Sequence, residues 1–191
     1  MIFMKNSTEY PTLVEIKDKK GEMIEKGEAK LRDLNNIRVK LNELRTSNPD
    51  DLDTIAQLEE EESHLTSEVL KLDLSIKILE VVEYIIESNI FEDYWKIIEE
   101  KIPYEELLNI VVENGLSIKK TCMELYKLAN IDDKNILKKI QNLPDDYPKE
   151  TKEDPNLQNK YLSKIISRIS RLKEFKSNLD EIVSDIISNM R

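Results

Sequence analysis

The chain has 191 residues and a formal net charge of −10, so it lacks the positive excess by which general nucleic-acid binders hold phosphates. Its single cysteine leaves no partner for a disulfide within the chain and fits a reducing compartment. Glycine and proline are scarce, and charged residues are so abundant that a compact globule would have difficulty exposing them all. We therefore expect an all-α protein of elongated shape.

The N-terminal segment, residues 1–17, has two interpretations. It forms either a short first helix that begins near Pro11 or an extended docking segment. Its apolar start is too short for a secretory signal, and no later run of about 18 apolar residues could span a bilayer. We expect an intracellular protein, cytoplasmic or nuclear, without a membrane span.

Residues 18–88 are predicted to form a long antiparallel coiled-coil hairpin, with helices at about 18–46 and 50–88. The second helix carries leucine or isoleucine at every seventh position and β-branched residues between them, a heptad pattern typical of helices packed lengthwise. A short turn around Pro49 favours an antiparallel return of the chain. The predicted seam consists of Leu58, Leu65, Val69, Leu72, Ile76, Leu79 and Ile86.

Charge supports this hairpin. Eight acids and no Lys or Arg occur between residues 47 and 70, whereas residues 30–45 hold five bases and two acids. Folding at the turn would bring these segments together, with Arg38 near Glu59 or Glu62. The acidic run is thus partly neutralised within the molecule, and such exposed pairs set the register more than the stability.

Two seam positions of the second helix are acidic, Glu62 and Glu83. Glutamates at these positions would repel each other in a parallel homodimer, so we predict that the seam packs on a different helix, with Lys176 as one candidate partner. The first helix should end opposite about residue 79. Since a second apolar stripe runs from Leu70 to Ile85, the end of the second helix is expected to leave the hairpin and enter a small helical core.

Residues 89–143 are predicted to supply that core as a small central helical bundle. One helix should cover about 90–101, the next should begin at Pro103 and end at Asn114-Gly115, and Ser117 should cap a third. A last short helix is expected at 133–142. The proline-rich stretch 144–156 is typical of a linker.

The stretch from Glu113 to Leu125 resembles the helix-turn-helix of some transposases. This resemblance implies an alternative function as a DNA-binding protein through residues 104–129. The absence of arginine between residues 45 and 168 and the acid Glu124 argue against nucleic acid as the partner. The lysines that would contact DNA are Lys119, Lys120 and Lys127.

Residues 157–191 are predicted to form a long C-terminal amphipathic helix. Its apolar seam and its basic face make it the candidate partner-binding element, through helix packing selected by charge. The basic face has a second interpretation, as a solvated flank or as the intramolecular match of the acidic half of the hairpin. The candidate partner-binding residues are Leu162, Ile165, Ile169, Leu172, Leu179, Val183 and Ile186 in the seam, and Lys160, Lys164, Arg168 and Arg171 on the basic face.

Catalytic chemistry has little support in the sequence. His64 lies on a helix surface beside a glutamate run, and Cys122 lies on an apolar helix face, so both are interpreted as structural residues. No phosphate-binding loop, metal-ligand spacing or catalytic triad pattern occurs, and we predict no catalytic residue, cofactor or metal site. Trp95 is expected in the core, and an exposed Tyr94 could anchor a partner.

The predicted function is therefore a non-enzymatic protein–protein interaction module: a coiled-coil subunit, adaptor or scaffold that forms a homo- or hetero-oligomer. The alternative is an acidic inhibitor that mimics charge and blocks a basic, nucleic-acid-binding protein. The helix-turn-helix function is the third interpretation.

Overall fold

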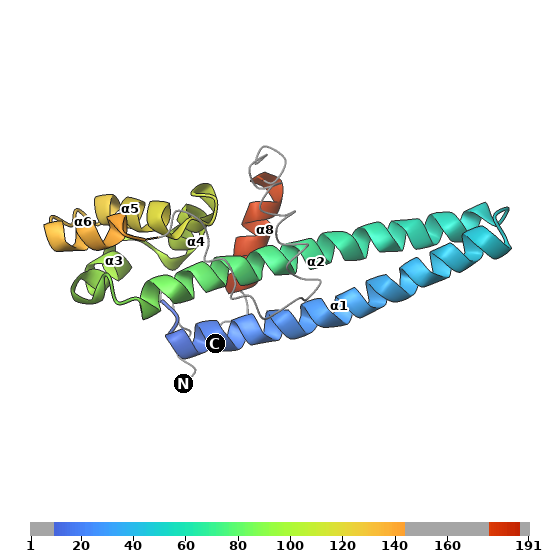
Figure 1. Cartoon of the computed structure of the whole chain (residues 1–191), viewed down its shortest axis with the longest axis horizontal. Helices are drawn as coiled ribbons and strands as arrows, with labels where there is room; N and C mark the ends of the chain where they lie inside the picture. Colours follow the sequence, from blue (N-terminus) through green and yellow to red (C-terminus); the bar gives the residue numbers. More distant parts are fainter. Residues whose placement is uncertain (1–9, 144–175, 188–191) are drawn as a thin grey trace, which may run out of the picture.

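The computed structural model describes residues 10–143 and 176–187, and every regular element in these ranges is a helix (Figure 1). Two long helices, α1 (Leu13–Ser47) and α2 (Leu52–Glu87), pack side by side as a hairpin. The all-α class and the helical hairpin are confirmed. The shorter elements are η1 (Glu92–Tyr94), α3 (Trp95–Lys101), α4 (Tyr104–Glu113), α5 (Ile118–Leu128), α6 (Lys134–Gln141) and α8 (Lys176–Ile187).

Helix α1 begins five residues before the predicted hairpin. Thr12 caps it, because its hydroxyl accepts a hydrogen bond from the backbone N–H of Glu15 at 3.2 Å. The predicted segment 1–17 therefore ends inside α1, and Gly21 does not interrupt the helix. A glycine inside a helix costs only about 1 kcal/mol relative to alanine, which the burial of apolar neighbours such as Ile16 offsets.

The hairpin turn matches the predicted position around Pro49. The backbone N–H of Asn48 donates to the carbonyl of Leu44 at 2.8 Å and ends α1. The Asp51 carboxylate then accepts from the Thr54 N–H at 3.4 Å and starts α2. Local capping thus fixes both helix ends, and only a few residues connect them.

Ion pairs cross the hairpin from its tip to its base, and they show its antiparallel register: residue numbers rise along α2 as they fall along α1. The guanidinium of Arg38 pairs with Glu62, one of the two partners that the sequence predicted. The pairs are Arg45–Glu59 at 2.6 Å, Arg38–Glu62 at 3.0 Å, Lys30–Glu68 at 2.6 Å, Lys20–Glu83 at 2.6 Å and Lys17–Glu87 at 2.8 Å.

One hydrophobic core joins the base of the hairpin, the small helices and α8. Helix α2 forms its centre, since every residue from 73 to 79 is buried and α4, α5 and α8 pack on it. The predicted second stripe from Leu70 to Ile85 belongs to this core. A helix with two apolar faces needs partners on both sides, and α2 has them.

The prediction that the first helix ends opposite about residue 79 is wrong. Because α1 starts at Leu13, it accompanies α2 to its last turn, where Lys17 pairs with Glu87. Helix α2 therefore does not leave the hairpin in order to enter the core. It takes part in both at once.

The turn between α4 and α5 has the predicted form. Gly115 has a φ of +63°, the left-handed conformation in which a residue without Cβ is unstrained. Leu116 also has a positive φ, +64°, and its side chain is buried in the core. The Ser117 hydroxyl accepts from the Lys120 N–H at 3.3 Å and caps α5.

The predicted linker 144–156 and the first part of the predicted C-terminal helix, 157–175, lie outside the described residues. Helix α8 falls within the predicted range 157–191.

Candidate interaction surfaces

The outer half of the hairpin projects away from the small helices, and among the described elements α1 and α2 contact only each other there (Figure 1). Its interface is narrow. Leu34, Ile37 and Leu41 of α1 are buried, while Leu58 and Leu65 of α2 are only half-buried. Most of the surface of both helices in this arm therefore faces outward.

The end of this arm is acidic. Residues 43–62 contain eight acids and one base, Arg45, so their net charge is −7. Glu59 and Glu62 form ion pairs with Arg45 and Arg38 of α1. Five other acids of this region are exposed and form no ion pair within the described part of the chain: Glu43 on α1 and four acids at the turn and on α2. We call the latter four the acidic tip: Asp50, Asp53, Glu60 and Glu61.

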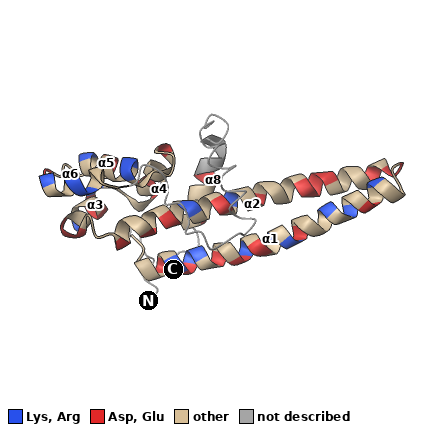
Figure 2. Ribbon diagram, in the orientation of Figure 1, with Lys and Arg blue, Asp and Glu red and all other residues tan. Residues whose placement is uncertain are grey.

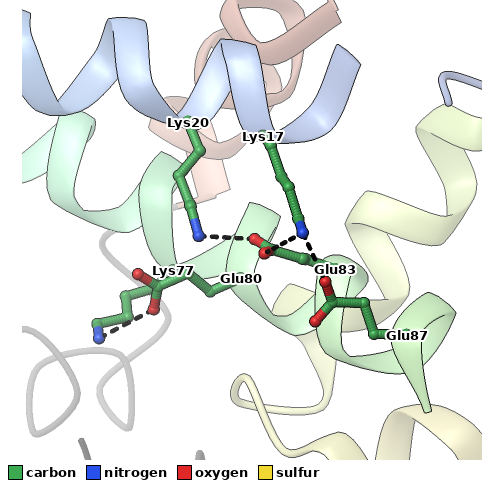
Figure 3. Close-up of polar contacts among 6 residues, drawn as sticks. All are labelled: Lys17, Lys20, Lys77, Glu80, Glu83 and Glu87. Atoms are coloured by element: carbon green, nitrogen blue, oxygen red, sulfur yellow. Dashed lines mark hydrogen bonds and ion pairs between the residues drawn. The ribbon is translucent and has the colours of Figure 1, made fainter. Parts of the chain in front are cut away.

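At the base of the hairpin, Glu83 lies between two lysines of α1 (Figure 3). Lys20 Nζ lies 2.6 Å from Glu83 Oε2 and Lys17 Nζ lies 4.0 Å from Glu83 Oε1. The Glu83 side chain is only 14% exposed, so this pair is more shielded from water than those near the tip. Both acidic seam positions, Glu62 and Glu83, thus have cations on α1; the side chain of the predicted partner Lys176 lies outside the described residues.

Three polar side chains are buried in the central turns of α2. The Ser75 hydroxyl donates to the Lys71 carbonyl at 2.9 Å, and Lys77 Nζ lies 3.2 Å from Glu80 Oε2 (Figure 3). Asp73 is 4% exposed, and its Oδ2 has no hydrogen-bond partner in the part of the chain that the structure describes. Burial raises the pKa of Asp73 to about 6, against the pull of the Lys77 ammonium.

Helix α8 packs inside the molecule. Val183 and Ile186, two of the candidate partner-binding residues, are buried in the common core together with Ile182. Glu181 on the outer side of α8 pairs with Lys71 of α2 at 3.0 Å. The remaining candidates lie outside the residues whose side chains are described: Leu162, Ile165, Ile169, Leu172, Leu179, Lys160, Lys164, Arg168 and Arg171.

An open groove of about 310 Å³ lies between α1, α2 and α8. Lysines of α1 and α2 line it, but Lys30 pairs with Glu68, and Lys71 pairs with Glu181. The lining holds four lysines and three acids, so its net charge is close to zero.

Helix α5 follows the glycine turn and faces the core with Ile118, Cys122 and Leu125. The lysines of the helix-turn-helix interpretation lie on its other side: Lys120 and Lys127 are exposed and Lys119 is half-buried. On this helix Glu124 accepts a hydrogen bond from the Asn114 side chain across the turn. The structure therefore places the predicted turn and its lysines together, with an acid among them.

Helix α6 extends this basic surface. It packs against α5 and carries further exposed lysines, and Figure 2 shows the blue segments of both helices gathered at the end of the molecule opposite the hairpin turn. None of its exposed lysines forms an ion pair among the described residues. We call the surface the α5–α6 lysine face: Lys120, Lys127, Lys134, Lys138 and Lys139.

The two residues considered for catalysis lie in different parts of the molecule. His64 is exposed on the hairpin arm, where its Nε2 lies 3.3 Å from Glu68. Cys122 is fully buried in the core, and burial raises the pKa of its thiol to about 12. A thiol that stays protonated is a poor nucleophile, which agrees with a structural residue.

An aromatic cluster at the base of the hairpin was missed by the sequence interpretation. The ring of Tyr10 packs edge-on against Trp95 and Tyr104, with centroids 5.8 and 5.4 Å away, and its hydroxyl donates to the Ile102 carbonyl at 2.5 Å. Tyr94, considered as a partner anchor, instead donates to Asp133 Oδ2 at 2.9 Å. Tyr10 and Pro11, before α1, gave no periodic signal from which this contact could be predicted.

No protein-family model matches the chain, and no solved structure matches it. In the described ranges, none of the helices combines the length and the apolar character that crossing a membrane requires.

Proposed function

We propose that the protein is a non-enzymatic interaction module, a subunit, adaptor or scaffold that joins a larger assembly through helix packing. The observation that carries the proposal is the projecting arm. About 35 residues of α1 form a helix of roughly 50 Å, and its outer half contributes to no core except the narrow seam with α2. An element of this kind exposes long helical faces at a fixed distance from the rest of the molecule.

The C-terminal segment supplies the proposed packing surface. Because α8 is anchored in the core by Val183 and Ile186, we assign these two residues to the fold and retain the earlier seam residues as the partner-binding set. These are Leu162, Ile165, Ile169 and Leu172, flanked by Lys160, Lys164, Arg168 and Arg171.

The single cysteine, buried as a thiol, supports placing the protein in a reducing compartment inside the cell. This localisation is part of the proposal.

Replacing Ile165 and Leu172 with glutamate tests the proposal. At about 0.5 M salt, where contacts between exposed charges are screened, the wild-type chain should form a concentration-dependent oligomer or gain solubility with its partner. The double variant should lose this association while its far-ultraviolet circular dichroism stays helical. Replacing the exposed Val14 of α1 and Ile97 of α3, which both lie outside the projecting arm, with glutamate provides a control with the same number of apolar-to-acidic changes. Equal loss in the control and in the seam variant would refute the assigned surface.

The acidic tip favours a second candidate function. Asp50, Asp53, Glu60 and Glu61 remain exposed after the pairing with α1, so the arm could present them to a basic protein in place of nucleic acid. A charge mimic of this kind should be monomeric and should lose its partner steeply with salt. Light scattering at several salt concentrations separates it from the seam-driven module.

A further inference from the structure

The cations of the hairpin and those of α5 and α6 differ in how they are paired. On the hairpin, most lysines and arginines have an acid within ion-pair distance: Lys17, Lys20, Lys26, Lys30, Arg38, Arg45, Lys71 and Lys77. The α5–α6 lysine face has five exposed lysines and no ion pair within the described residues.

Nearby acids compensate this face only in part. Residues 114–143 hold six lysines against three acids, a net charge of +3 in a chain whose total is −10. Asp133 caps α6, accepts from Tyr94 and attracts Lys139, and Glu124 accepts from Asn114. With all three acids counted, the surface keeps an excess of positive charge.

The uncompensated negative charge lies at the other extreme of the molecule. Figures 1 and 2 place the hairpin turn and helices α5 and α6 at opposite ends of the longest axis. Helix α2 spans this distance with 36 residues, which corresponds to about 54 Å. Because α2 is one continuous helix, the acidic tip cannot reach the lysine face of its own molecule.

We propose that the α5–α6 lysine face binds the acidic tip of a second copy of this chain. Both surfaces are exposed, both lack ion pairs among the described residues, and their charges are opposite. Their spacing also agrees: Lys120 and Lys127 are seven residues apart on α5, as are Asp53 and Glu60 on α2. Seven residues are about two helical turns, roughly 10.5 Å on one face of each helix, so both pairs can form at once.

This contact is independent of the proposed C-terminal seam and uses none of its residues. Single exposed ion pairs are weak, so the association should be weak and should depend on several pairs acting together. The net charge of −10 opposes it at long range, but the Debye length of about 8 Å at physiological salt confines that repulsion. The complementary ends remain attractive at contact distance.

Charge exchange between the two ends tests the inference on the full chain. One variant carries Lys120→Glu and Lys127→Glu, and the other carries Asp53→Lys and Glu60→Lys. Each is followed by sedimentation velocity over a concentration series. Part of the wild-type association at about 0.1 M salt should disappear by about 0.5 M, and this salt-sensitive part is the one assigned to the contact. Each variant alone should weaken the salt-sensitive association at least tenfold, and an equimolar mixture of the two should recover it.

Matched controls carry the same net charge changes elsewhere. Arg32→Glu with Lys40→Glu and Glu25→Lys with Glu28→Lys alter exposed residues of α1 that belong to neither surface, and both should associate like the wild type. A monomeric wild type, an unchanged association of the charge variants, or a mixture that stays monomeric would each overturn the inference. Association that resists these changes but disappears with Ile165→Glu and Leu172→Glu would also overturn it, and would leave the proposed function standing.

Competition identifies the occupant of the lysine face. A short DNA duplex added in excess should not bind the face at physiological salt if the acidic tip is its ligand. Tighter binding of the duplex than of a second copy, lost in the Lys120→Glu, Lys127→Glu variant, would overturn the inference in favour of the DNA-binding interpretation.

Discussion

The coupling free energy of the ion pairs should decrease from Lys20–Glu83 toward the hairpin tip, because the pairs become more exposed in that direction, whereas Lys17–Glu87 in the last turn of α2 is exposed again. The Lys20 and Glu83 side chains are 23% and 14% exposed, whereas Arg45 and Glu59 are both 49% exposed. The distances are equal at 2.6 Å, so exposure is the main difference between the two pairs. The perturbation is a double-mutant cycle at each pair, Lys20→Met with Glu83→Gln and Arg45→Met with Glu59→Gln.

The expected coupling free energies follow from how well each ion pair is shielded from water. An exposed pair contributes about 0.2–1 kcal/mol, so the Arg45–Glu59 coupling should lie near ~0.3 kcal/mol. A charged hydrogen bond that is shielded from water contributes about 1.5–3 kcal/mol. Since Lys20 is still partly solvated, we expect a coupling of roughly 1.5 kcal/mol for Lys20–Glu83.

Urea unfolding followed by circular dichroism at neutral pH measures both couplings. Repeating the cycles in about 1 M salt, where the Debye length is about 3 Å, should abolish the coupling at the tip and retain most of that at the base. A coupling at Arg45–Glu59 equal to or larger than that at Lys20–Glu83 would refute the reasoning, as would a value near zero at both.

Three further predictions concern single positions. The pKa of Asp73 in the folded protein, about 6, lies above its ordinary value of 3.8. The free energy of unfolding of the wild type should therefore fall by on the order of 2–3 kcal/mol as pH rises from about 4 to 7. Asp73→Asn should remove this pH dependence in urea unfolding measured at several pH values. Gly115→Ala should destabilise the folded protein by about 1 kcal/mol because of the φ of +63°. Gly21→Ala, in an exposed helical position with open space around it, should stabilise the folded protein by about 0.5–1 kcal/mol. The two variants should shift the thermal unfolding midpoint in opposite directions, and shifts in the same direction would contradict the account. Cys122 should resist alkylation by iodoacetamide in the native protein and react fully in urea; rapid native labelling would contradict its burial.

Local chemistry in the sequence predicted much of the fold. Pro49 located the turn, the opposed charges of residues 30–45 and 47–70 located Arg38 beside Glu62, and the Asn114-Gly115 pair located the left-handed end of α4. Each of these signals comes from neighbouring residues in the chain or from two helices joined by a short turn, so tertiary packing does not override it.

The start of α1 could not be predicted in the same way. Gly21 suggested a weak beginning, but a helix that packs along its whole length tolerates the loss of about 1 kcal/mol at one residue. The contact of Tyr10 with Trp95 and Tyr104 joins residues far apart in sequence and has no periodic signature.

The candidate partner surface shows a limit of periodicity. The stripe that includes Val183 and Ile186 has the same pattern whether it packs inside the chain or on another chain, and in α8 it packs inside. Paired and unpaired lysines are likewise indistinguishable in sequence. Only the fold shows that most cations of the hairpin are paired and that most lysines of α5 and α6 face outward.

Affinity capture of the full chain from its native host, with the Ile165→Glu, Leu172→Glu variant in parallel, tests the interaction function most directly. The account predicts a stoichiometric partner, either another protein or a second copy of the chain. The wild type and the Val14→Glu, Ile97→Glu control should retain this partner, and the seam variant should lose it. No stoichiometric partner for the wild type, or the same partner retained by the seam variant, would contradict it.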